Sequence, residues 1–148
     1  MELLRISTVL LLEDEPTDAF FFERAIRKHA PNVRLHVAAD GLDGLAYIQK
    51  QGKYSEGNYS NPDLVVVDLK MPRMGGLEFL RWVREHPQHR VIPTLVLTSS
   101  VLEMDIQTAY ELGVSTFFVK PNDPEEFSAM LKLIFDYWRM ARIPPAIL

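Results

Sequence analysis

Short apolar runs alternate with amphipathic segments along the whole chain. Residues 8–12 and 64–67 are almost uninterrupted apolar runs, which is typical of strands buried on both faces of a parallel sheet. Residues 33–37 instead alternate between apolar and polar side chains, which indicates an edge strand with one solvated face. The strands predicted in this way span residues 8–12, 33–37, 64–67, 94–97 and 115–119.

The segments between these strands have the periodicity of amphipathic helices. Pro16 suits the first turn of a helix whose apolar face includes Phe22 and Ile26 and whose opposite side carries Phe20. The next helix, predicted over residues 41–51, has an apolar stripe made of Leu42, Leu45, Ala46 and Ile48. The later helices are predicted over residues 77–85, over residues 102–112, and around a regular stripe that runs from Phe127 to Trp138.

Strict alternation of strand and helix predicts an α/β protein. Helices that link parallel strands cover both faces of the sheet, so we expect a doubly wound, flavodoxin-like (βα)5 fold. The edge-like second strand beside more buried neighbours favours the strand order 2-1-3-4-5. Residues 52–61 form the longest polar, turn-rich stretch, and we expect them to be irregular.

Composition narrows the classes of function. At 148 residues, with 47% hydrophobic residues, the chain suits one domain, with a core over about residues 7–140 and an extension over 141–148. The absence of cysteine excludes disulfides and thiolate metal sites. A net charge of −4 without a dense basic cluster argues against nucleic-acid binding. Without a membrane-spanning run or a secretory apolar region, we expect a cytoplasmic protein with no membrane partner.

Polar side chains stand where four of the predicted strands end. Glu13 and Asp14 follow the first strand, Asp68 the third, Thr98 the fourth and Lys120 the fifth. The carboxyl ends of parallel strands share one edge of the sheet, so these side chains should converge near the switch point between the first and third strands. Core packing gives no reason to gather three acids, a hydroxyl and a lysine there.

Such a cluster suits phosphoryl transfer with a divalent cation, Mg²⁺ or Mn²⁺. Asp14 and Asp68 would each provide one oxygen ligand, the backbone carbonyl of Lys70 a third, and Glu13 would act through water. Asp68 is then an anionic nucleophile that accepts a phosphoryl group. The metal would neutralise charge on the phosphoryl oxygens, together with two further side chains, those of Thr98 and Lys120.

Each of these residues also has a simpler interpretation. An acid after a strand is equally often a helix N-cap, which applies to Asp14 and Asp68. Thr98 alone would be a turn or cap residue, and Lys120 alone a solvated charge. The joint arrangement, rather than any one residue, therefore carries the prediction of a phosphoryl site.

The sequence strongly resembles the receiver domain of two-component response regulators. The resemblance covers nearly the whole chain, through residues 9–14, 63–76, 95–98 and 117–121. It implies that a sensor histidine kinase phosphorylates Asp68, with Mg²⁺ held by Glu13 and Asp14. It implies no enzyme acting on a separate substrate, but a phosphoacceptor that catalyses its own phosphorylation and dephosphorylation.

The resemblance also implies a conformational switch. Thr98 would shift toward the phosphate while Phe117 turns inward, which would repack the face formed by the fourth helix, fifth strand and fifth helix. Tyrosine is frequent in the family where Phe117 stands, and phenylalanine lacks its hydroxyl. The bond before Pro121 is usually cis in the family, so we expect a cis proline here.

The C-terminal extension and the 52–61 stretch resemble stand-alone regulators paired with bacterial phytochromes. We therefore expect a phytochrome kinase as partner, and no DNA-binding or catalytic domain after the last helix. The extension is apolar and Pro144-Pro145 prevents its continuation as a helix, so a homodimer is expected. The candidate dimer contacts are Tyr137, Trp138, Ile143, Ile147 and Leu148. Alternatively, the extension folds back onto its own subunit.

Three other readings compete with a response regulator. A haloacid-dehalogenase-type phosphatase needs a second aspartate two residues after the nucleophile, where this chain has Lys70. An FMN-binding flavodoxin needs a phosphate loop after the first strand, where three acidic residues would repel a phosphate. A receiver-like binding module that works without phosphorylation stays open. The role of Lys70, over the phosphoryl group or in solvent, also stays open.

Overall fold

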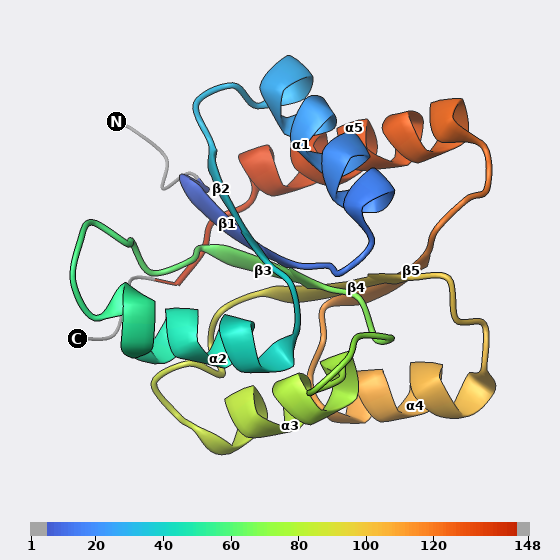
Figure 1. Cartoon of the computed structure of the whole chain (residues 1–148). Helices are drawn as coiled ribbons and strands as arrows, with labels where there is room; N and C mark the ends of the chain where they lie inside the picture. The colour runs from blue at the N-terminus through green and yellow to red at the C-terminus, as the bar shows by residue number, and fades with distance from the viewer. Residues whose placement is uncertain (1–5, 145–148) are drawn as a thin grey trace.

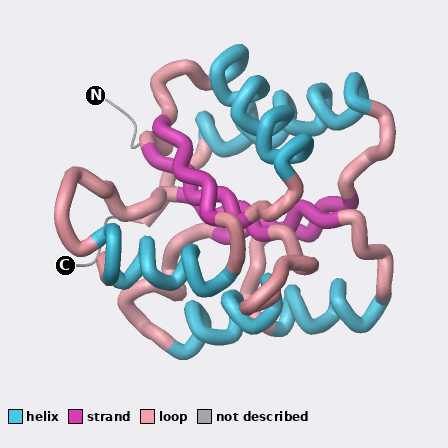
Figure 2. Tube along the Cα trace, viewed as in Figure 1, coloured by secondary structure: helices cyan, strands magenta, loops and turns pink. Residues whose placement is uncertain are grey.

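A parallel sheet divides the molecule into two helical layers, with α1 and α5 on one face and α2, α3 and α4 on the other (Figures 1 and 2). The computed structural model describes residues 6–144. The sheet order is β2-β1-β3-β4-β5, which confirms the predicted fold. The elements are β1 Thr8–Leu12, α1 Pro16–His29, β2 Arg34–Ala38, α2 Gly41–Gln49, the short 3-10 helix η1 Gly52–Tyr54, β3 Leu64–Val67, α3 Gly76–Glu85, β4 Thr94–Thr98, α4 Glu103–Glu111, β5 Thr116–Val119 and α5 Pro124–Met140.

The core lies on both faces of the three inner strands β1, β3 and β4. Every residue of these strands is buried, as the uninterrupted apolar runs predicted. Alternate residues face opposite layers: Leu10 and Val65 join the cluster that contains Phe79 of α3, whereas Val9 joins the cluster that contains Phe22 of α1. No helix within residues 6–144 is long and apolar enough to cross a membrane.

The buried face of α2 differs from the predicted stripe. Leu42 is 46% exposed, so its placement on the buried stripe was wrong. The helix instead turns Gly44 toward the sheet, where a Cβ atom would come within 2.8 Å of the Leu12 side chain. Glycine allows this close approach, and the rotation that it permits leaves Leu42 in solvent while Leu45 and Ile48 are buried.

Residues 52–61 are less irregular than their polar sequence indicates. Tyr54, the last residue of η1, is only 2% exposed. Its hydroxyl donates to Asp43 Oδ1 at 2.7 Å and lies 2.8 Å from His36 Nε2. The His36 ring stacks on Tyr47 with 4.5 Å between ring centres, and Tyr59 packs edge-on against this group. An aromatic cluster therefore holds the segment against β2 and α2.

The chain after α5 folds back onto its own subunit at Ile143. This side chain is 8% exposed and belongs to the same buried cluster as Ile6 and Phe135. The expectation that Ile143 has no core left to enter, and is free for a dimer contact, was therefore wrong. The physical reason is that the side chain finds apolar neighbours in that cluster, where its burial is favourable. Ile147 and Leu148 lie outside the described residues.

The Tyr54 hydroxyl provides a test of the aromatic cluster. Tyr54→Phe removes the donor to Asp43 and the partner of His36 Nε2, so we expect a loss of about 1–2 kcal/mol in unfolding free energy. Urea denaturation of the two proteins measures this difference. Tyr59→Phe is the matched control, because its ring belongs to the same cluster but its hydroxyl makes no hydrogen bond within residues 6–144. Equal stabilities for the Tyr54 variant and wild type would contradict this role.

His36 should make part of the stability depend on pH. Burial lowers the pKa of His36 below its ordinary 6.5; Asp43 opposes this effect, whereas Lys53 and Lys50 add to it. The unfolded chain then binds a proton more readily than the folded one, so this contribution is present above pH 6.5 and is lost as the pH falls below it. We expect His36→Phe to flatten the loss of unfolding free energy between about pH 7 and pH 5. Parallel pH profiles of the two proteins would refute this.

Candidate functional site

The candidate site lies at the carboxyl ends of β1, β3, β4 and β5. Asp68 follows β3, and its backbone N–H donates to the carbonyl of Leu12, which ends β1. Gly76, the first residue of α3, lies so close to the Asp68 carbonyl that a Cβ atom would collide with it. The chain can therefore turn sharply into α3 and leave the Asp68 carboxylate at the rim of the sheet.

Thr98 and Lys120 contact Asp68 directly. The Thr98 hydroxyl, fully buried at the end of β4, donates to Asp68 Oδ1 at 2.7 Å. The ammonium of Lys120 donates to Asp68 Oδ2 at 3.0 Å and to Glu13 Oε1 at 2.6 Å. Lys120 reaches this position because its backbone N–H continues the ladder between β5 and β4 by donating to the Thr98 carbonyl.

Burial and charge act against each other in this cluster. Burial raises the pKa of Glu13 to about 7, although Lys120 opposes the rise. Burial would also raise the pKa of Asp68, but hydrogen bonds from Thr98 and Lys120 outweigh it and hold that pKa below its usual value. Burial disfavours the Lys120 ammonium, yet bonds to Asp18 and Glu13 raise its pKa overall. Asp68 is therefore kept as the anion that a nucleophile requires.

Three carboxylates at the site are close enough to share a cation. One oxygen each from Glu13, Asp14 and Asp68 lies within 4.8 Å of the others, and this is the one such group within residues 6–144. Glu13 and Asp68 are buried, whereas Asp14 is exposed. A hard cation such as Mg²⁺ or Mn²⁺ takes oxygen ligands and keeps several waters. The exposed position of Asp14 permits such waters.

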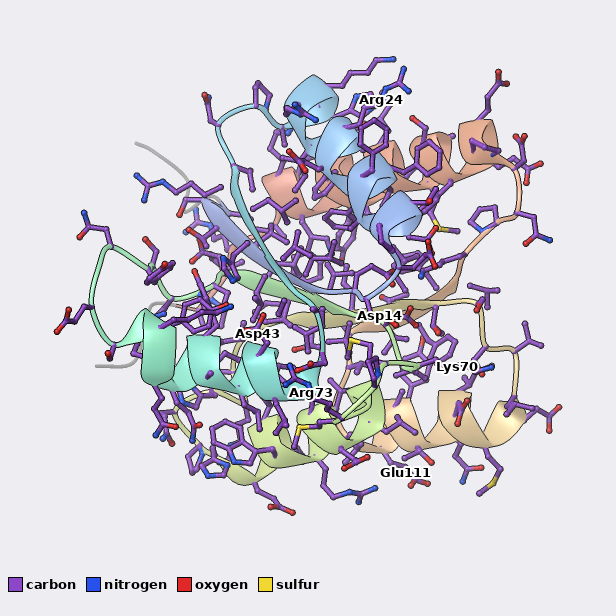
Figure 3. The ribbon with its side chains drawn as sticks, in the orientation of Figure 1. Asp14, Arg24, Asp43, Lys70, Arg73 and Glu111 are labelled. Carbon is purple, nitrogen blue, oxygen red and sulfur yellow. The ribbon has the colours of Figure 1, made fainter. Side chains whose placement is uncertain are left out.

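The loop after Asp68 is fixed to α2. Figure 3 shows Lys70 at the same end of the sheet as Asp14, and the Lys70 backbone N–H donates to Asp68 Oδ1 at 3.3 Å. Further along, Arg73 has a left-handed backbone (φ 64°) and binds the buried Asp40 carboxylate through Nε at 2.6 Å. The Gly41 N–H donates to the Met74 carbonyl at 2.9 Å. The Lys70 side chain is exposed.

Asp18 is the site residue that sequence reasoning missed. Its carboxylate, in the first turn of α1, accepts from Lys120 Nζ at 2.8 Å. An acid in the first turn of a helix is ordinarily explained by the helix dipole alone. A usable signal was present, because Asp18 lies in the first turn of a helix that begins at the same rim of the sheet.

The two residues of the predicted switch lie on neighbouring strands. Thr98 ends β4, and Phe117 of β5 is paired with Val96 of β4. Phe117 is half-buried, and its backbone N–H donates to the Tyr110 hydroxyl at 3.1 Å. Because Tyr110 belongs to α4, this bond joins the strand to the helix at the face where the switch is expected.

The expected cis proline is absent. The Lys120–Pro121 bond is trans, so this prediction was wrong. A bond before proline favours trans by about 0.5–1 kcal/mol, and cis needs a surrounding structure that demands it. Here Lys120 already meets both Thr98 and the carboxylates with a trans bond.

Known proteins resemble this chain in sequence and in fold. Residues 9–132 match the sequence profile of the response regulator receiver domain. Response regulator Rcp1 of Synechocystis sp. is 31% identical over 130 residues, which cover 88% of this chain and 87% of Rcp1. The Mn²⁺-bound form of Rcp1 superimposes with a TM-score of 0.88 at 29% identity, covering 94% of this chain and 99% of that one. The phosphorylated cyanobacterial phytochrome response regulator RcpA gives 0.89 at 28% identity, covering 95% and 99%. The chain is therefore a member of the response regulator receiver domain family.

Proposed function

We propose that this protein is a single-domain response regulator that accepts a phosphoryl group on Asp68 from a sensor histidine kinase. The observation that carries the proposal is the direct contact of Asp68 with both Thr98 and Lys120. A hydroxyl and an ammonium beside a carboxylate anion suit a phosphoryl group, whose charge they can meet. The likeness to RcpA, whose structure is of the phosphorylated protein, supports the same chemistry.

Transfer begins with an Asp68 carboxylate oxygen and the phosphorus of a phosphohistidine in the kinase. The new O–P bond forms as the N–P bond breaks, and the imidazole leaves with the bonding electrons and takes a proton from solvent. Thr98 and Lys120 turn their donors toward the phosphoryl oxygens. In dephosphorylation, water attacks the phosphorus, the bond to Asp68 breaks, and inorganic phosphate leaves while the carboxylate is restored.

Glu13, Asp14, Asp68 and the backbone carbonyl of Lys70 are the groups proposed to hold a divalent cation. When bound, Mg²⁺ or Mn²⁺ neutralises charge on the phosphoryl oxygens and relieves repulsion between the carboxylates. The spacing of the three carboxylates and the Mn²⁺ in Rcp1 support this assignment. Asp14, as the exposed member, would be the ligand most accessible to a cation from solvent.

The output of the switch is proposed to be the α4-β5-α5 face. Movement of Thr98 toward the phosphate would open space for Phe117 to turn inward. The bond between the Phe117 N–H and the Tyr110 hydroxyl supports transmission to α4, because both elements share it. A phenylalanine acts here through packing, since it has no hydroxyl to exchange between partners.

The upstream partner is proposed to be a bacterial phytochrome kinase. RcpA is a cyanobacterial phytochrome response regulator, and its structure covers 95% of this chain. The extent of that likeness also supports one receiver domain over residues 1–148, with residues 141–148 as an extension of the core.

A homodimer through α5 and β5 is the proposed assembly. Leu133, Tyr137 and Met140 of α5 are 70%, 66% and 80% exposed. Leu133 and Tyr137 line an apolar hollow of about 400 Å³ between α5 and β5, whose walls include Phe118 and the half-buried Trp138. Apolar surface gathered in this way is typical of a protein–protein contact.

Phosphorylation of Asp68 is tested by exposure to acetyl phosphate and Mg²⁺. We expect the wild type to gain one phosphoryl unit by intact mass spectrometry, and Asp68→Asn to gain none because the nucleophilic oxygen is lost. Chelation of the metal should also prevent labelling. Asp136→Asn, which alters an exposed aspartate of α5, is the matched control and should behave as wild type.

Two outcomes would contradict this proposal. Equal labelling of the Asp68 variant would place the phosphoryl group elsewhere. A wild type that stays unlabelled, yet binds its kinase, would favour the alternative of a binding module that works without phosphorylation.

The dimer is tested with charges on the exposed face of α5. Leu133→Glu and Tyr137→Glu should each lower the mass measured by light scattering from dimer to monomer, because a buried carboxylate at an apolar contact is costly. Ser128→Glu adds the same charge to the same helix outside the hollow and should leave the mass unchanged. An unchanged dimer in both α5 variants would place the interface on another surface.

A further inference from the structure

The Lys120 ammonium has every donor engaged in the structure. Its three N–H groups meet three carboxylates: Glu13 at 2.6 Å, Asp18 at 2.8 Å and Asp68 at 3.0 Å. The longest of these contacts is the one to Asp68. The Lys120 side chain is only 8% exposed, so solvent does not replace any of these partners easily.

Asp18 differs from the other two acids because it lies outside the group of carboxylates that can share a cation. Glu13 and Asp68 both belong to that group. It projects from α1, and its side chain is 28% exposed. A cation at the site would therefore neutralise charge on Glu13 and Asp68. The carboxylate of Asp18 would keep Lys120 as its partner.

We propose that Asp18 is a positioning residue that holds Lys120 toward α1 and competes for it with a phosphoryl group on Asp68. This inference rests on the proposed phosphorylation of Asp68. A phosphoryl oxygen can gain a bond from Lys120 only if one of the three existing bonds is given up. Asp18 also places a negative charge beside a group that itself carries nearly two, which weakens the phosphorylated state.

The alternative to this proposal is a purely structural role, in which Asp18 only stabilises the start of α1. The start of α1 has its own support, because Glu15 caps the Thr17 N–H at 3.3 Å and Pro16 stands in the first turn. Asp18→Asn keeps an oxygen that accepts from Lys120 and removes only the charge. The substitution therefore separates the electrostatic effect of Asp18 from its use as a tether.

The test compares the binding of two ligands of opposite charge. Beryllofluoride imitates the phosphoryl group and is titrated at saturating Mn²⁺; Mn²⁺ is titrated alone. We expect Asp18→Asn to bind beryllofluoride roughly three- to tenfold more tightly, as for a screened charge at a partly exposed site. Mn²⁺ should bind equally well or up to about twofold more weakly, since a nearby negative charge is lost. A damaged site would instead lose affinity for both ligands.

Controls separate this inference from the proposed function. Glu23→Gln removes an exposed charge from the same helix and should match wild type for both ligands. Asp18→Ser is a second neutral variant and should also tighten beryllofluoride binding. Unchanged or weaker beryllofluoride binding in both Asp18 variants overturns the role of Asp18. A wild type that fails to bind beryllofluoride with Mn²⁺ overturns the phosphorylation of Asp68 itself.

Discussion

One ammonium surrounded by carboxylates is the contact on which the site depends. Lys120 meets Glu13, Asp18 and Asp68 in a place where little water reaches. Acids so close together repel, and burial adds a cost for each charge. The sheet register fixes the position of Lys120 beside Thr98, so the backbone of β4 and β5 supplies the stability that this arrangement needs.

The same contact explains how the fold can hold several mutually repelling carboxylates at one rim of the sheet. Lys120 offsets part of the repulsion, but it cannot neutralise Asp14 as well as its three partners. A divalent cation would complete the balance, and a phosphoryl group would disturb it again. In the proposed function, Asp68 would thus lie beside two added charges of opposite sign, and each would change which groups its neighbours contact.

Much of this could be predicted from sequence because strand burial and topology leave strong marks. The apolar run before Asp68 predicts a central strand. Parallel topology then places the carboxyl end of that strand at the same edge of the sheet as the end of the strand before Lys120. Asp18 and Tyr54 were missed because their roles depend on side-chain contacts between distant segments, which periodicity does not encode. The conformation of the bond before Pro121 was predicted wrongly because that prediction rested on the conformation usual in the family and not on the residues of this chain.

The attachment of the loop after Asp68 has a consequence for ion exchange. Arg73 and Gly41 fix this loop to α2 at the stage of folding, so its conformational entropy is already lost in the resting protein. A cation that reaches the Lys70 carbonyl would meet a preorganised ligand rather than a segment that must first become ordered. Binding of the proposed ion would then not require this part of the backbone to become ordered first.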